Sequence, residues 1–119
     1  MRDLMELFVG VPRYHVNNSM SYLEKYIKLL IAGDYVDDIA DARGIVKNLQ
    51  FRMKRKSDII SIPLSTLMQT INHLTIYRSL LHACEDVSEN DVQKLIDFLI
   101  DCEQAAISLF KKERDDGSR

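Results

Sequence analysis

The sequence is poor in the residues that mark secreted, disulfide-bonded or low-complexity proteins. It has no tryptophan, two cysteines, two prolines and four glycines among 119 residues. Two cysteines cannot build the disulfide framework of a small secreted domain, and no basic and apolar leader follows Met1. We therefore expect a protein of the reducing cytosol. The chain also has no internal repeat and no low-complexity tract.

No sign of charge dominates, and no apolar run is long. Lys and Arg total 16 against 18 Asp and Glu, which leaves a net charge of −2. A chain with this balance has no global field that would draw it to nucleic acid or to an anionic membrane, so any such binding must be local. The longest apolar runs, such as residues 27–32, are interrupted by charge and too short to span a bilayer. We expect no membrane partner.

The usual signatures of catalysis and metal binding are missing as well. The sequence contains no GxGxxG, P-loop, HExxH, CxxC or nucleophile-elbow motif. His82 and Cys84 are two potential metal ligands without a second pair, so we expect no metal and no cofactor. Cys84 and Cys102 lie too far apart along a helical hairpin for a disulfide, and we interpret both as buried thiols. His73 falls on a polar helix face, where we expect solvent around it.

The apolar residues that are present recur at intervals of three and four, which is typical of amphipathic helices. The chain has the length of one domain. We predict helices over residues 19–32, 37–56, 63–83 and 88–112. Asn18 or Ser19 would cap the first helix and Gly33 would end it, while Pro63 fits the first position of the third.

These elements predict an all-α fold, an antiparallel four-helix bundle with an N-terminal arm or short helix. The arm is residues 1–16, in which residues 3–9 could form a short helix that packs on the bundle. The bundle is residues 17–112, and residues 113–119 are a flexible polar tail. Residues 59–62 alternate briefly like a strand, but they precede Pro63 and we interpret them as an extended connector.

Several helices carry more apolar surface than one bundle seam requires. The apolar arc covers roughly 200° of the first helix and on the order of 220° of the fourth, and the third helix has a second apolar stripe. Either the N-terminal arm covers the excess or a second copy of the chain does, as a homodimer. The candidate self-association residues are Tyr22, Tyr26, Leu29, Ile76 and Leu80.

Phe51 projects from the second helix nearly opposite its apolar face and among cations. One interpretation is an aromatic anchor for an acidic partner or a nucleic-acid base. The other, which we favour, is that Phe51 packs under the arm or the connector while the cations decorate the helix end. The candidate partner-binding residues are Lys47, Phe51, Arg52, Lys54 and Arg55. Lys56 joins them in a nucleic-acid interface.

Three polar side chains fall on apolar helix faces, namely Arg78, His82 and Glu103. We predict a buried ion pair between Arg78 and Glu103 with His82 nearby. The segment Arg78-Ser79-Leu80-Leu81-His82 also resembles the Arg and His motif of the HEPN ribonucleases, which are helical bundles. That family places four to six residues between the two, with a polar one after the Arg, whereas this chain has three. The resemblance implies a catalytic Arg78 and His82; we favour the structural ion pair.

The function we expect follows from these features. It is a small non-enzymatic protein that acts by binding another protein, as a regulator, adaptor, inhibitor or immunity-type factor of a bacterium or its phage. The first alternative is a nucleic-acid-binding regulator that uses the basic end of the second helix. The second alternative is a ribonuclease-like enzyme centred on Arg78 and His82.

Overall fold

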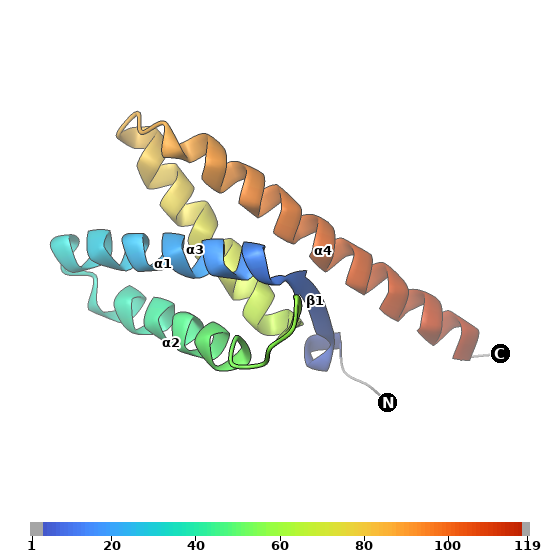
Figure 1. Ribbon diagram of the computed structural model, residues 1–119. Helices are drawn as coiled ribbons and strands as arrows, with labels where there is room; N and C mark the ends of the chain where they lie inside the picture. The colour runs from blue at the N-terminus through green and yellow to red at the C-terminus, as the bar shows by residue number, and fades with distance from the viewer. Residues whose placement is uncertain (1–3, 118–119) are drawn as a thin grey trace.

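The computed structural model describes residues 4–117, which form four α-helices and a two-stranded antiparallel sheet (Figure 1). The elements in chain order are the 3-10 helix η1 (Leu4–Glu6), β1 (Phe8–Pro12), α1 (Arg13–Gly33), α2 (Val36–Arg52), β2 (Ile59–Pro63), α3 (Leu64–Ala83) and α4 (Ser88–Gly117). The prediction of a mostly helical fold with four helices is confirmed.

The helices form two hairpins that meet through α1 and α3. α1 packs against α2, and α3 packs against α4, each pair joined by a short turn. Figure 1 shows α4 continuing past β1 to the C-terminus, so that the molecule is elongated, with extents of 54 × 27 × 26 Å. The prediction ended this helix at Lys112, whereas its backbone remains helical to Gly117.

The core lies between the hairpins and under the sheet. Leu23 of α1, Leu49 of α2, Leu74 of α3 and Leu99 of α4 are each at most 2% exposed. Each belongs to the apolar stripe that the helical period predicts. The second stripe of α3 is different, because Ile76 and Leu80 stay substantially exposed.

The N-terminal arm and the segment before Pro63 form the sheet, which the sequence analysis missed. Residues Phe8 to Pro12 pair with Ile59 to Pro63 in antiparallel register, with Val11 opposite Ile60. Both strands alternate in burial, so that Val9, Val11, Ile60 and Ile62 face the core. The interpretation of residues 59–62 as a connector was therefore wrong. Of residues 3–9, which could have formed one short helix, Leu4–Glu6 form a 3-10 helix and residues 8 and 9 belong to β1, while residue 3 lies outside the described residues. These five-residue strands are stabilised by pairing with each other and by packing against the helices.

Four helix boundaries also differ from the prediction. α1 begins at Arg13 rather than near Ser19, whose buried hydroxyl instead donates a hydrogen bond of 2.8 Å to the carbonyl of His15. The left-handed residue after α1 is Asp34 (φ 61°), not Gly33. α2 ends at Arg52, four residues before the predicted end, so that the basic residues that follow lie in a loop. Pro63 is the residue before α3 rather than its first.

None of the helices within residues 4–117 has the length and apolar character needed to cross a membrane.

Candidate functional site: an aromatic and cationic hollow

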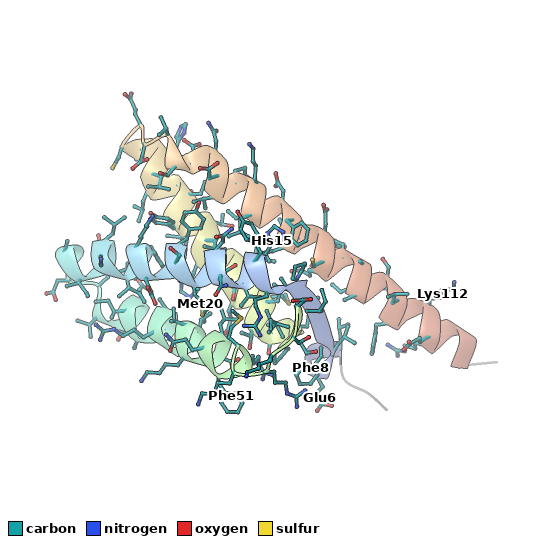
Figure 2. The ribbon with its side chains drawn as sticks, in the orientation of Figure 1. Glu6, Phe8, His15, Met20, Phe51 and Lys112 are labelled. Atoms are coloured by element: carbon teal, nitrogen blue, oxygen red, sulfur yellow. The ribbon has the colours of Figure 1, made fainter. Side chains whose placement is uncertain are left out.

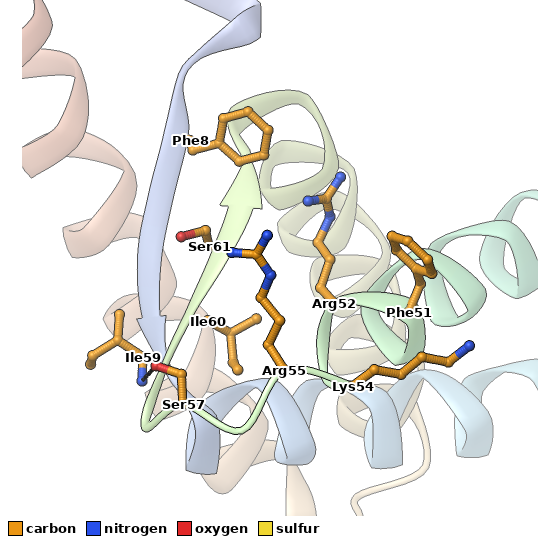
Figure 3. A pocket seen from close by; sticks show the side chains of 9 residues that line it. All are labelled: Phe8, Phe51, Arg52, Lys54, Arg55, Ser57, Ile59, Ile60 and Ser61. Carbon is orange, nitrogen blue, oxygen red and sulfur yellow. Dashed lines mark hydrogen bonds between the residues drawn. The ribbon is translucent and has the colours of Figure 1, made fainter.

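A hollow of about 690 Å³ opens where the sheet meets the loop after α2 (Figure 3). It is bounded by β1, by the C-terminal end of α2, by the loop and by β2. Its lining residues are Phe8, Phe51, Arg52, Lys54, Arg55, Ser57, Ile59, Ile60 and Ser61. Three of them are cations and none is a carboxylate. Volumes of this size are common for binding sites.

Two phenylalanine rings from distant parts of the chain converge on this hollow. Phe8 begins β1 and is 52% exposed, and Phe51 lies in the last turn of α2 and is 67% exposed. Figure 2 shows both side chains on the same flank of the molecule. The two rings are accessible to a partner, which corrects the interpretation that Phe51 packs under the arm or the connector.

Cations lie over both rings. The guanidinium carbon of Arg52 is 5.3 Å from the centre of the Phe8 ring, and the Lys54 ammonium is 5.6 Å from the centre of the Phe51 ring. Figure 3 shows the Arg52 side chain between the two rings. The Arg52 Nε also donates a hydrogen bond of 2.8 Å to Asn48 Oδ1, one turn back on α2. These contacts hold the aromatic and cationic groups together.

Arg13, which was not among the residues predicted from the sequence, binds the loop that carries Lys54 and Arg55. The Arg13 guanidinium donates hydrogen bonds to the carbonyl of Ser57 (2.7 Å), to that of Met53 (3.2 Å) and to that of Arg55. The backbone N–H of Arg13 also donates to the Asp58 carbonyl (2.7 Å). Nothing in the local sequence indicates these bonds, because they join residues at least forty positions apart.

The charges of the hollow are not neutralised within the described part of the chain. The ion pairs found among the described side chains join Arg78 and His82 to Glu89. No described carboxylate lies within ion-pair distance of Arg52, Lys54 or Arg55. The hollow therefore presents unneutralised positive charge beside apolar surface.

Not every predicted partner-binding residue belongs to this hollow. The structure brings Phe51, Arg52, Lys54 and Arg55 together there, but it places Lys47 in a separate depression between α1 and α2, with Glu24 and Arg43. Lys56 is exposed in the loop and does not line the hollow. Of the cations that line the hollow, only Arg52 lies in the last turn of α2. The favourable interaction of a cation with a helix C-terminus therefore explains the position of Arg52 but not those of Lys54 and Arg55.

The predicted pair between Arg78 and Glu103 was wrong. Arg78 Nη1 lies 3.5 Å from Glu89 Oε1, and His82 Nδ1 lies 3.0 Å from the same carboxylate. Glu89 is in the first turn of α4, directly across the turn from His82, whereas Glu103 is about 21 Å further along that helix at 1.5 Å per residue. Glu103 instead accepts a hydrogen bond from Gln104. The cluster is a surface feature, since the His82 side chain is 74% exposed.

One of the candidate self-association residues does not lie on the surface. Tyr26 is 1% exposed and packs near Tyr77 and His73 in the core, so it is not available to a second copy. Leu29, Ile76 and Leu80 are between 39% and 48% exposed, and Tyr22 is half-buried. The spacing of apolar residues along α1 did not show which of them face α3 and which face water.

His73 and Cys84 also have other surroundings than expected. His73 is half-buried, its Nδ1 has no hydrogen-bond partner among the described atoms, and burial lowers its pKa. His15 stacks on Phe98 of α4 with ring centres 3.9 Å apart. Cys84 is exposed rather than buried, because it lies in the turn between α3 and α4. Within the described residues, no group of three His, Cys, Asp or Glu side chains is placed to hold a metal ion.

Comparisons with protein-family models, with curated proteins and with solved structures found no match to this chain. The hollow and the residues that build it are therefore the basis for assigning a function.

Proposed function

We propose that this protein acts by binding another protein, and that the hollow receives an acidic segment of that partner with an aromatic or apolar anchor. The observation that carries the proposal is the convergence of two exposed rings, Phe8 and Phe51, with Arg52, Lys54 and Arg55 at one hollow. A role as a regulator, adaptor or inhibitor requires such a surface and no catalytic group.

The chemistry of the hollow favours an anionic and apolar ligand. Aromatic and arginine side chains contribute most often to binding hot spots, because they bury large apolar area and donate several hydrogen bonds. The unneutralised cations would attract an acidic segment and accelerate its association. Covering Phe8 and Phe51 would add the hydrophobic contribution of two aromatic rings.

The scaffold that we propose for this surface is an antiparallel four-helix bundle. α1 with α2 and α3 with α4 are antiparallel hairpins, and α1 and α2 both contact α3. A bundle of this kind would hold β1 and the end of α2 in a fixed relation, and Arg13 would hold the loop. The ligand would then meet a preformed site and would lose less ordering entropy on binding.

The test is the binding of a fluorescent acidic peptide that contains one central tyrosine, measured by anisotropy at low salt and in a salt series. We expect binding that weakens as salt rises and that is lost in Phe51→Asp and in Lys54→Glu. Lys47→Glu is the matched control, because it makes the same charge change on α2 outside the hollow. Equal binding by Lys54→Glu and Lys47→Glu would refute the proposed site.

A single-stranded oligonucleotide serves as the competing ligand in the same assay. Exposed rings beside cations also suit stacking on a nucleic-acid base. We favour a protein partner because the chain is net acidic and only three cations line the hollow. Oligonucleotide binding that depends on Phe51 and exceeds peptide binding would replace this proposal by the nucleic-acid one.

A further inference from the structure

The turn between α1 and α2 forms a second unusual surface, which we call the tip, residues Asp34, Tyr35, Val36, Asp37 and Asp38. Tyr35 is 59% exposed and Val36 is 66% exposed. The three aspartates of the tip are all exposed as well. The tip is thus an aromatic and an aliphatic side chain flanked by acids, which is the ligand chemistry that the hollow favours.

Gly33 leaves room for the tyrosine ring to lie against the backbone. A Cβ atom at Gly33 would lie 2.5 Å from Tyr35 Cε2 and 2.8 Å from Cδ2, so the ring occupies the space that any other residue at 33 would need. Asp34 holds the left-handed conformation that ends α1, and its backbone N–H bonds to the carbonyl of Ile31. The ring therefore lies against the backbone at Gly33 and still presents most of its surface to water.

The tip and the hollow carry opposite charge. Neither Asp34, Asp37 and Asp38 nor the cations of the hollow take part in an ion pair among the described side chains. The hollow has room for a tyrosine ring together with flanking carboxylates. Acidic side chains are favourable in the first turn of α2, because the N-terminus of a helix carries partial positive charge. This interaction leaves their carboxylates able to bind a cation as well.

The two surfaces lie at opposite ends of α2, as the ends of that helix in Figure 1 show. Seventeen residues at 1.5 Å per residue separate them by about 25 Å, so a tip cannot enter the hollow of its own molecule. Each molecule can offer its tip to one neighbour and its hollow to another. Such a contact is heterologous and does not close in a two-fold dimer.

We propose that the hollow receives the tip of a second copy of this chain, so that copies associate head to tail. This inference rests on the proposed function, because it uses the same hollow and names a further ligand for it. Association would occupy the hollow and so regulate its availability to another protein. Tyr35 inserts beside Phe51, while Asp37 and Asp38 face Lys54 and Arg55.

The experiment measures solution mass over a concentration series at low salt for wild type and two variants. In the first variant, Asp37→Asn with Asp38→Asn weakens the tip; in the second, Phe51→Ala with Arg55→Gln weakens the hollow. We expect the wild-type mass to rise beyond that of a dimer and to fall again with added salt. Each variant alone should remain a monomer, and circular dichroism should show that both are folded.

The decisive sample is the mixture of the two variants. The first keeps an intact hollow and the second keeps an intact tip, so the mixture should form a one-to-one heterodimer and nothing larger. A wild type that remains monomeric at every concentration would overturn the inference. A closed dimer that persists in both variants would also overturn the inference, because its interface would lie outside the tip and the hollow.

The acidic peptide separates failure of this inference from failure of the proposed function. If wild type stays monomeric but the peptide still binds and depends on Phe51, only the head-to-tail inference is wrong. If the peptide does not bind, the proposed function is wrong. If the chain associates head to tail and also binds the peptide, peptide binding by wild type should weaken as protein concentration rises. The variant with Asp37→Asn and Asp38→Asn should bind the peptide equally well at every protein concentration.

Discussion

Arg13 provides the sharpest test of how the hollow is built. Its guanidinium donates to the carbonyls of Met53, Arg55 and Ser57, and these bonds hold the loop that follows α2 against the start of α1. Replacing Arg13 with alanine removes all three bonds but keeps the backbone bond from Arg13 to Asp58. We expect Arg13→Ala to destabilise the fold and to weaken peptide binding at the hollow together.

The size of the effect follows from the exposure of these bonds. A hydrogen bond from a charged donor contributes about 1.5–3 kcal/mol to the free energy of unfolding. The three bonds of Arg13 lie at or near the surface, where water can replace the guanidinium as a hydrogen-bond partner and so reduces the effect of losing them. We therefore expect about 2 kcal/mol for the three together. An unfolding entropy of about 2.1 cal/mol/K per residue over 119 residues is about 0.25 kcal/mol/K, so Tm should fall by about 8 °C.

Thermal unfolding by circular dichroism, together with peptide anisotropy, measures both effects. Arg13→Lys keeps the charge but not the planar set of donors, so it should lie between wild type and Arg13→Ala. Arg43→Ala is the matched control, because Arg43 is exposed on α2 outside the hollow, and it should change stability by less than about 0.5 kcal/mol. An Arg13→Ala protein with wild-type Tm and wild-type peptide binding would refute this account of the loop.

Three further predictions concern the core and the titratable groups. Leu74 is fully buried, so Leu74→Ala should cost about 2–5 kcal/mol in chemical unfolding, whereas Leu109→Ala, at a side chain 62% exposed, should stay within about 0.5 kcal/mol. Burial lowers the pKa of His73, so the unfolded state binds a proton at this residue more readily than the folded state does. The free energy of unfolding should therefore fall as the pH drops below about 6.5, the ordinary pKa of histidine. His73→Asn should make this fall smaller. A His73→Asn protein with the wild-type pH profile would contradict this assignment. Cys84 is exposed and Cys102 is half-buried with its pKa raised by burial, so a thiol reagent should modify Cys84 first in the native protein; equal rates would count against the structure of the turn.

The pairing of the polar residues on α3 illustrates what a helical period leaves open. The period indicates correctly that Arg78 and His82 share one side of the helix, since they are four residues apart. It does not fix how far α4 is shifted along α3, and that shift decides between Glu89 and Glu103. The short turn at residues 84–87 brings Glu89 beside them, and this depends on the conformation of Glu85, which has a positive φ of 55°.

The helical class, the number of helices and most of the buried stripes could be predicted from the sequence. The reason is that the period of apolar residues along a helix is local information, as Leu23, Leu74 and Leu99 show. The sequence also indicated that Phe51 was unusual, because it interrupts that period among cations.

The surroundings of Phe51, in contrast, depend on tertiary contacts. The pairing of β1 with β2 brings Phe8 to the end of α2, and the bonds from Arg13 place Lys54 and Arg55 beside both rings. Each of these contacts joins residues far apart in the chain, and strands of five residues leave too short a pattern to predict their partner. The hollow is therefore a product of long-range packing, whereas the helices that carry it follow from local sequence.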